Sequence, residues 1–125
     1  MKKLISIGFV VSLLSACATN EPPIYHWGSY QQSMYENMKQ ENLDPVEHIA
    51  VLEKDKEKAA SLNRSVPPGF YAYLGMLYAD LGRGGDAASA FHQEKTLFPE
   101  ATTFMDFLLN PNKSSAEAVA VAAQE

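Results

Sequence analysis

The 125-residue chain contains a single cysteine, Cys17, so no second thiol is present to form an internal disulfide. Its longest apolar run, residues 4–16, is also short. As a helix that run would reach about 20 Å, less than the roughly 30 Å hydrocarbon core of a bilayer. A permanent membrane-spanning helix is therefore not expected, and the fold has to depend on an apolar core.

The sequence also lacks the common motifs of catalysis and metal binding. The histidines, His26, His48 and His92, lie far apart, and no H-E-x-x-H pattern is present. No serine lies in a nucleophile-elbow sequence, and the glycines at 82–85 follow an expected helix, whereas a phosphate-binding loop follows a strand. We therefore predict no enzyme activity, no metal and no bound cofactor.

A strong positive charge is absent as well. The formal net charge is −5, and removal of an N-terminal segment containing Lys2 and Lys3 would make it more negative. The overall field of such a chain does not attract nucleic acid, so we predict no nucleic-acid partner.

The only dense charge cluster is EKDKEK, residues 53–58. It could be an electrostatic docking face or a solvated helix surface with the pairs Glu53–Lys56 and Asp55–Lys58. We favour the solvated surface because the signs of the charges alternate.

The N-terminus is typical of a secretory signal, with MKK followed by the apolar run and small residues. Residues 14–17, Leu-Ser-Ala-Cys, resemble a bacterial lipobox; an ordinary signal with a chance cysteine is the alternative. The resemblance implies that residues 1–16 are a lipoprotein signal peptide. It also implies that Cys17 carries a diacylglyceryl group and an N-acyl chain such as palmitate. Ala18 in place of Asp then favours the outer membrane, with the body in the periplasm; surface exposure stays open.

After the lipidated tether, residues 17–24, the sequence predicts an all-α domain over residues 25–110 and a disordered tail over 111–125. Five helices are expected. The first runs from Ser29 to about Gln40, with Ser29 and Gln32 as a capping box, and the second from Asp44 to about Asn63. The others span residues 68–81, 86–98 and 102–110, with Asp86 and either Thr102 or Thr103 as caps.

Apolar spacing predicts one apolar stripe on the first helix and the inward face of the second. In the first helix Tyr30, Met34 and Met38 recur every four residues, with Tyr35 beside them. In the second helix the residues predicted to face inward are Val46, Ile49, Ala50, Leu52 and Ala59.

Residues 68–99 resemble one tetratricopeptide repeat, a pair of antiparallel helices with a fixed set of small and aromatic residues. The matching residues are Tyr71, Leu74, Gly75, Tyr78, Gly82, Ala87, Phe91 and Pro99. Two departures are Glu94, at a position that usually carries Ala, and the glycines at 84 and 85, where helix formers are usual. Residues 29–63 would be a degenerate repeat and the last helix a cap.

The repeat resemblance implies a concave groove lined by the first helix of each pair. Tyr71 and Tyr78, with Tyr30 and Met34, are the candidate contacts in that groove. The stretch IYHWGSY, residues 24–30, adds Tyr25 and Trp27. This stretch could be a recognition patch or a plug that covers the first helix pair; we favour the plug.

The order of lipobox, tether, Y-x-W-G-x-Y, helix pair and repeat resembles a family of small bacterial outer-membrane lipoproteins of unknown function. Members tend to be encoded beside other lipoproteins, including ones that resemble the curli-secretion pore lipoprotein. The resemblance implies a lipid-anchored, protein-binding adaptor or assembly factor in a complex with other envelope lipoproteins. The alternatives are a structural lipoprotein that stabilises a pore without groove binding, or a peptidoglycan- or small-ligand-binding module.

Overall fold

The computed structural model of the protein describes residues 22–41 and 44–110. These residues form five α-helices and one 3₁₀ turn: α2 (Tyr30–Lys39), α3 (Pro45–Ser61), α4 (Phe70–Asp80), α5 (Gly84–Leu97), η2 (Pro99–Ala101) and α6 (Thr102–Leu109). The predicted all-α array of about five helices is confirmed. The predicted signal peptide, Cys17, most of the tether and the tail lie outside the described residues.

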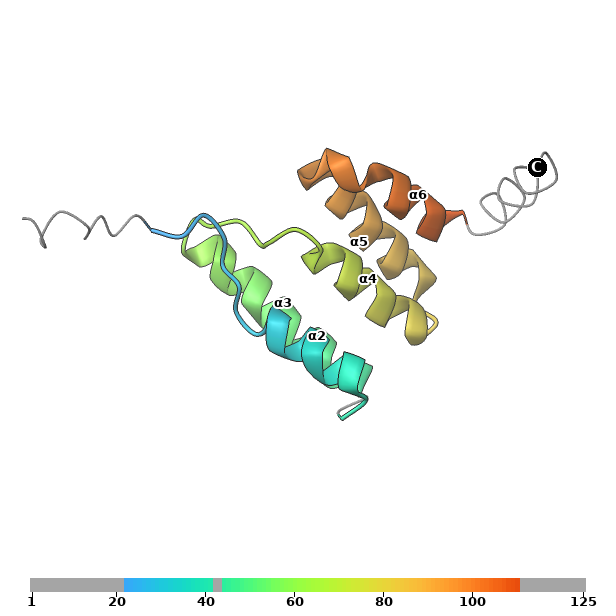
Figure 1. The fold of residues 1–125 in the computed structure, drawn as a ribbon, viewed down its shortest axis with the longest axis horizontal. Coiled ribbons are helices and arrows are strands. Elements are labelled where there is room, and N and C mark those ends of the chain that lie inside the picture. The colour runs from blue at the N-terminus through green and yellow to red at the C-terminus, as the bar shows by residue number, and fades with distance from the viewer. Residues whose placement is uncertain (1–21, 42–43, 111–125) are drawn as a thin grey trace, which may run out of the picture.

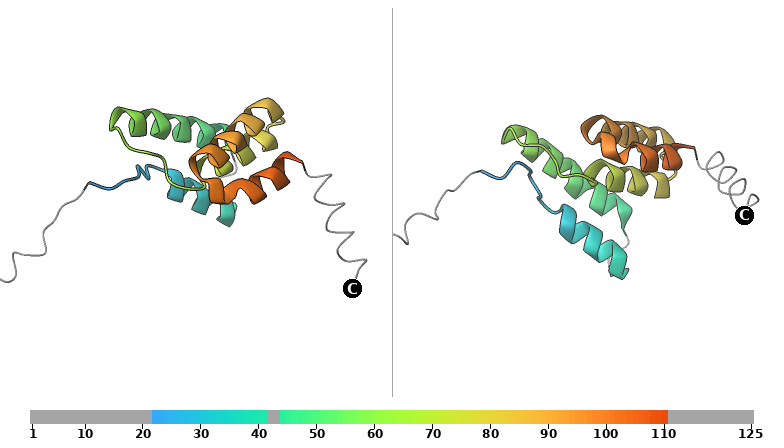
Figure 2. Two further views of the ribbon diagram at one scale, coloured as in Figure 1. Left: turned by 90° about the horizontal axis from the view of Figure 1, so that it is seen from above. Right: turned by 45° about the horizontal axis from the view of Figure 1, so that its top comes forward.

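Each helix packs against the next along the chain, and α4 lies in the middle of the array (Figure 1). Seen from above, α2 and α6 lie on one side of α4, and α3 and α5 lie on the other (Figure 2). The core gathers around α4, and its least exposed large apolar residues are Leu52, Phe70, Leu74, Leu77 and Met105. Burial of each such side chain stabilises the fold by about 1.5–3 kcal/mol.

The start of α2 differs from the predicted capping box. Ser29 is the N-cap residue, but its side chain makes no capping hydrogen bond. Gln32 Nε2 donates to Glu36 Oε1 at 2.7 Å instead. The backbone N–H of Ser29 donates to Asp55 Oδ2 at 2.6 Å, so a carboxylate of α3 holds this end of α2. The prediction was wrong because a residue far away in the sequence supplies the acceptor.

Helix α3 begins as predicted, with Pro45 in its first turn and the Asp44 side chain accepting from the Val46 N–H at 2.9 Å. Of the residues predicted to face inward, three are buried: Ile49, Leu52 and Ala59. Val46 and Ala50 are exposed, so the prediction was wrong for these two. They are four residues apart and share a helix face that α4 does not cover.

The charge run on α3 is only partly a solvated surface. Lys56 pairs with Glu53 as predicted. Asp55 does not pair with Lys58: its carboxylate binds the Ser29 N–H, and its Oδ1 lies 3.9 Å from His26 Nε2. Carboxylates of this run therefore hold other segments of the chain in place.

The connections on either side of α4 use glycines with positive φ, Gly69 at 87° and Gly82 at 70°. Glycines 84 and 85 form the first turn of α5 and are not part of the loop, contrary to the predicted turn. Asp86 does not cap α5 as predicted, because the helix begins two residues earlier, at Gly84; the Asp86 carboxylate lies in the first turn and accepts from Arg83 Nε at 2.8 Å. Two helical glycines cost about 1 kcal/mol each relative to alanine.

Helices α4 and α5 approach each other closely at Gly75. A Cβ atom placed on Gly75 would lie 2.5 Å from Cε1 and 2.7 Å from Cδ1 of Phe91. Ala87 is buried nearby on α5. A side chain at position 75 would therefore force the aromatic ring of Phe91 out of its place.

Glu94 is buried on α5, with 1% of its surface exposed. Its carboxylate accepts from the backbone N–H groups at the start of α4: Gly69 at 2.6 Å, Tyr71 at 3.1 Å and Ala72 at 3.3 Å. The N-cap residue Gly69 has no side chain to satisfy these donors. Glu94, the residue that departs from the repeat pattern, thus caps the N-terminus of α4.

Helix α6 starts without the predicted threonine cap. The preceding turn η2 runs directly into it, Ala101 is the N-cap residue, and neither Thr102 nor Thr103 makes a capping hydrogen bond. Met105 is buried, whereas Phe104 is exposed and stacks on Phe107 with ring centroids 6.4 Å apart. One face of α6 closes the core and the other presents aromatic rings to solvent.

Candidate functional site

The four predicted groove residues lie in two different places. Tyr71 and Tyr78 line one pocket, and Tyr30 and Met34 line another. The two pockets lie on different sides of α4, since one is formed with α3 and α5 and the other with α2 and α6. The prediction of a single groove with all four residues was therefore wrong: the first helix α2 packs on the opposite side of α4 from the α3–α5 face.

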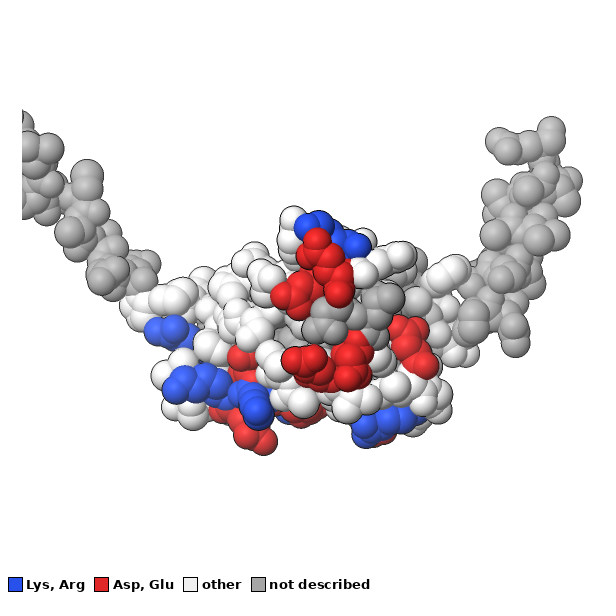
Figure 3. Space-filling view, turned by 90° about the horizontal axis from the view of Figure 1, so that it is seen from below, with Lys and Arg blue, Asp and Glu red and all other residues white. Residues whose placement is uncertain are grey.

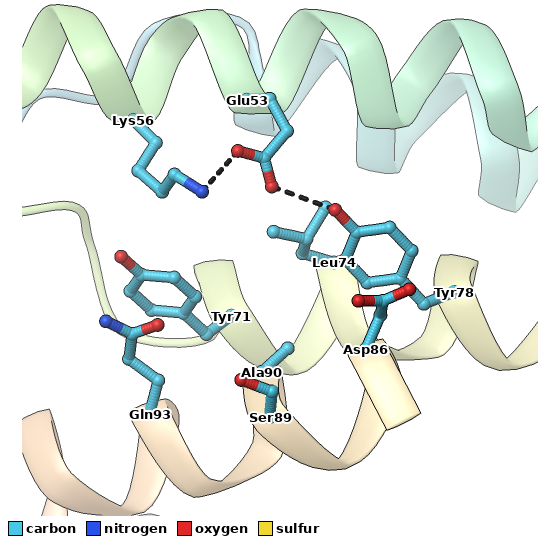
Figure 4. Close-up of a pocket in the computed structure, with 9 residues that line it drawn as sticks. All are labelled: Glu53, Lys56, Tyr71, Leu74, Tyr78, Asp86, Ser89, Ala90 and Gln93. Carbon is cyan, nitrogen blue, oxygen red and sulfur yellow. Dashed lines mark hydrogen bonds and ion pairs between the residues drawn. The ribbon is translucent and has the colours of Figure 1, made fainter. Parts of the chain in front are cut away.

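We call the first site the polar pocket (Figure 4). It has a volume of about 170 Å³ and is lined by Glu53, Lys56, Tyr71, Leu74, Tyr78, Asp86, Ser89, Ala90 and Gln93. Glu53 is the centre of its hydrogen bonds, because it accepts from the Tyr78 hydroxyl at 2.9 Å and pairs with Lys56. The guanidinium of Arg83 lies over the Tyr78 ring, 4.5 Å from its centroid.

Burial and charge keep the phenols of this pocket protonated. Burial, then the hydrogen bond from Tyr78 to Glu53 and the charge of Glu53, raise the pKa of Tyr78 to about 12. Burial is also the main cause that raises the pKa of Tyr71. Both phenols therefore stay protonated to a higher pH than an exposed tyrosine does. The charged groups around Tyr78 already bind one another, which leaves little unsatisfied polarity for a ligand.

The second site, the apolar groove, has a volume of about 290 Å³. Helices α2, α4 and α6 form it, with the residues Tyr30, Met34, Asn37, Met38, Gly69, Ala72, Tyr73, Met76 and Phe104. Several of its apolar side chains are open to solvent: Met38 is 74% exposed, Met76 47% and Phe104 55%. Exposed methionines are typical of adaptable protein-binding surfaces.

Sequence reasoning named Tyr30 and Met34 as contact residues, although in a groove shared with Tyr71 and Tyr78, and it missed Met76 and Phe104. Met76 is three residues after Tyr73 on α4, so the two share a face. That face could have been recognised as facing away from Phe91. Phe104 belongs to a helix interpreted only as a cap for the end of the array, so nothing in the pattern indicated that it lines a groove.

The aromatic stretch before α2 connects both ends of the array. Trp27 stacks on Tyr30, with ring centroids 6.5 Å apart, and Tyr25 lies 6.3 Å from the ring of Phe98 at the end of α5. The N–H of His26 donates to the carbonyl of Ser65 at 2.8 Å. Trp27 is still 43% exposed. The stretch thus packs on the helices while one face of the indole ring is open to solvent.

A buried serine–histidine contact lies between α2 and α3. Ser33 Oγ and His48 Nδ1 are hydrogen-bonded, and both residues are buried beside a small third pocket. The backbone carbonyl of Ser33 also accepts from the Tyr73 hydroxyl at 3.0 Å. These contacts tie α2 to α3 and α4. Sequence reasoning gave neither residue a role.

The face seen from below carries charges of both signs (Figure 3). Asp and Glu side chains gather near the middle of the underside, with Lys and Arg groups toward its edges (Figure 3). Within residues 22–41 and 44–110, no group of three or more His, Cys, Asp or Glu side chains could hold a metal ion. None of the helices in this part of the chain is long and apolar enough to cross a bilayer.

Comparison with known proteins places the chain in one family. No curated protein and no solved structure matches it. A family described as a domain of unknown function, DUF4810, matches residues 24–108. The matched range includes the aromatic stretch, the polar pocket and the apolar groove. It also includes all five helices except the last residue of α6. The chain therefore belongs to the DUF4810 family.

Proposed function

We propose that this chain is a lipid-anchored protein-binding adaptor or assembly factor of the cell envelope, acting in a complex with other lipoproteins. The observation that carries the proposal is the apolar groove with its exposed Met38, Met76 and Phe104. Contiguous apolar surface on a small domain marks a place where a partner binds. The polar pocket is a weaker candidate because Glu53, at its centre, is already paired.

The proposed anchor is the lipid on Cys17, which would hold the body in the periplasm at the outer membrane. Two or more acyl chains are enough for stable membrane attachment. We expect a Cys17→Ser variant to lose incorporation of labelled palmitate and to move from the membrane fraction to the soluble fraction. A variant that stays fully membrane-bound would contradict the lipid anchor and leave the groove argument untouched.

We also infer that α4 and α5 are related to the tetratricopeptide repeat. The close approach of Gly75 to Phe91 supports this, as does the burial of Ala87 in the same helix pair. Pro99 follows Phe98, the C-cap residue of α5, and begins η2 in the position where the repeat pattern ends a unit. In this interpretation the helix pair is the rigid scaffold, and α2 and α6 add the walls of the apolar groove.

In-cell photo-crosslinking tests the adaptor function. A photoreactive phenylalanine analogue at Met38 should capture an envelope protein, identified by mass spectrometry. Met76→Lys should abolish this capture, because an ammonium group in the groove floor opposes burial of an apolar partner. Gln93→Lys, which adds the same charge at the polar pocket, is the matched control and should leave the capture unchanged.

The same experiment separates the alternatives. Capture only from a photoreactive group at Tyr78 would move the site to the polar pocket. Capture from neither position would favour a structural lipoprotein without groove binding. Co-sedimentation of the purified chain with peptidoglycan, abolished by Gln93→Lys, would favour a ligand-binding module instead.

A further inference from the structure

The apolar groove has a definite electrostatic direction. Helices α2 and α4, which supply most of its lining, run in the same direction (Figure 1), so the C-terminal ends of both lie toward the same end of the groove. The C-terminal end of a helix carries a partial negative charge. Helix α2 has Lys39 in its last turn, whereas α4 has no basic residue there to compensate this charge.

A carboxylate adds to this negative end. Asp80, the last residue of α4, is four residues after Met76 and therefore lies on the same face as the groove floor. The charge of Asp80 helps to raise the pKa of Tyr73, a groove residue, although burial is the largest cause. Among the ion pairs of the described residues, none involves Asp80.

The nearby cations are engaged elsewhere. Lys39 pairs with Glu41 and lies over the Tyr35 ring, 5.1 Å from its centroid. Arg83 pairs with Asp86 and covers the Tyr78 ring on the polar-pocket side of α4. Neither cation pairs with Asp80, so this carboxylate is available to a partner.

We propose that the apolar groove binds an amphipathic helix of a partner protein, with Lys or Arg side chains at the end where α2 and α4 finish, beside Asp80. Apolar side chains of the helix would lie along Met34, Met76 and Phe104. Helix α4 has 11 residues, about 16 Å, so the groove accommodates roughly three turns with contacts at positions i, i+3, i+4 and i+7. This inference rests on the proposed function, since it specifies the partner of the same groove.

Two synthetic peptides of about 16 residues test the partner's chemistry. Both carry leucines at i, i+3, i+4 and i+7; one has lysines and the other glutamates in one terminal turn. Fluorescence anisotropy with the full purified chain should show the lysine peptide binding about fivefold more tightly at low salt, as expected for an exposed ion pair with Asp80 and the partial charge at the end of α4. Added salt should reduce the difference in affinity between the two peptides. Met76→Lys should abolish binding of both peptides.

Charge reversal locates the contact. Asp80→Lys should remove most of the preference for the lysine peptide, whereas Glu57→Lys, the same charge change at an exposed position on α3, should not. Equal affinity for both peptides, no binding of either, or equal effects of the two reversals would overturn the basic-helix proposal. A dimer in sedimentation that Met76→Lys disperses would also overturn it, because the occupant would be a second copy. If Met38 still captures an envelope protein, the adaptor function survives any of these failures.

Discussion

Replacement of Glu94 by alanine should destabilise the domain strongly, although alanine is the usual residue at this position of a tetratricopeptide repeat. The carboxylate accepts three backbone hydrogen bonds at the start of α4, and the side chain is buried. Each donor left without a partner costs about 1–3 kcal/mol when water does not replace the acceptor. Water can reach part of the half-buried Gly69, so we expect a total loss of about 3–5 kcal/mol.

Urea and thermal denaturation followed by circular dichroism would measure this loss. A loss of about 3 kcal/mol lowers the Tm of a domain of this size by roughly 12–24 °C. Glu94→Gln keeps one oxygen acceptor and should lose about half as much. Gln93→Ala, on the exposed side of the same helix turn, is the control and should change stability by less than about 0.5 kcal/mol. If Glu94→Ala unfolds at the same temperature as the parent, the carboxylate does not cap α4 and the reasoning fails.

Three other perturbations test separate parts of the fold. Gly75→Ala should cost about 1–3 kcal/mol because its Cβ would meet the Phe91 ring, and Phe91→Leu should reduce that cost in a double-mutant cycle; additive costs would contradict the contact. Burial, with smaller contributions from Glu94 and Tyr73, raises the pKa of Tyr30 from 10.0 to about 12. The stability that this shift contributes is complete below pH 10 and is lost as the pH rises through 12, by up to about 3 kcal/mol. Tyr30→Phe should abolish this part of the loss in urea titrations at alkaline pH, and an unchanged profile would refute it. Asp55→Asn should weaken the hydrogen bond at the start of α2 and speed hydrogen exchange of the Ser29 amide, whereas Glu57→Gln should leave the exchange rate unchanged. Equal exchange rates in the two variants would contradict the hydrogen bond from Ser29 to Asp55.

Helix positions were predictable from the sequence where the signal is local. The Asp44-Pro45 start of α3 depends on neighbouring residues alone, and the structure has it as predicted. The glycine at 82 likewise marks the end of α4, because a left-handed residue there stops a helix. The capping of α2 and α6 was predicted wrongly, since a threonine or serine in the right place caps a helix only if no other group takes the donors first.

The tertiary contacts of carboxylates could not be predicted. Glu53, Asp55 and Glu94 look like ordinary charged helix residues, yet each accepts a hydrogen bond from a segment more than 20 residues away in the sequence. Which carboxylate turns inward depends on where another helix starts. The predicted groove residues were divided between two pockets for the same reason. Residue spacing places Tyr30 and Tyr71 each on a face of its own helix. It does not tell on which side of α4 the helix α2 packs, because that depends on how the connection between α3 and α4 runs.

The apolar groove follows from the size of the helices that surround α4. On one side α4 is covered by the 17-residue α3 and the 14-residue α5, but on the other side only by the 10-residue α2 and the 8-residue α6. Two short helices leave Met76 uncovered, and small domains bury a low fraction of their surface in any case. A partner helix would complete this layer. A free partner concentration of 100 times the Kd would then raise the free energy of unfolding by about 2.7 kcal/mol, so partner binding and folding stability are linked.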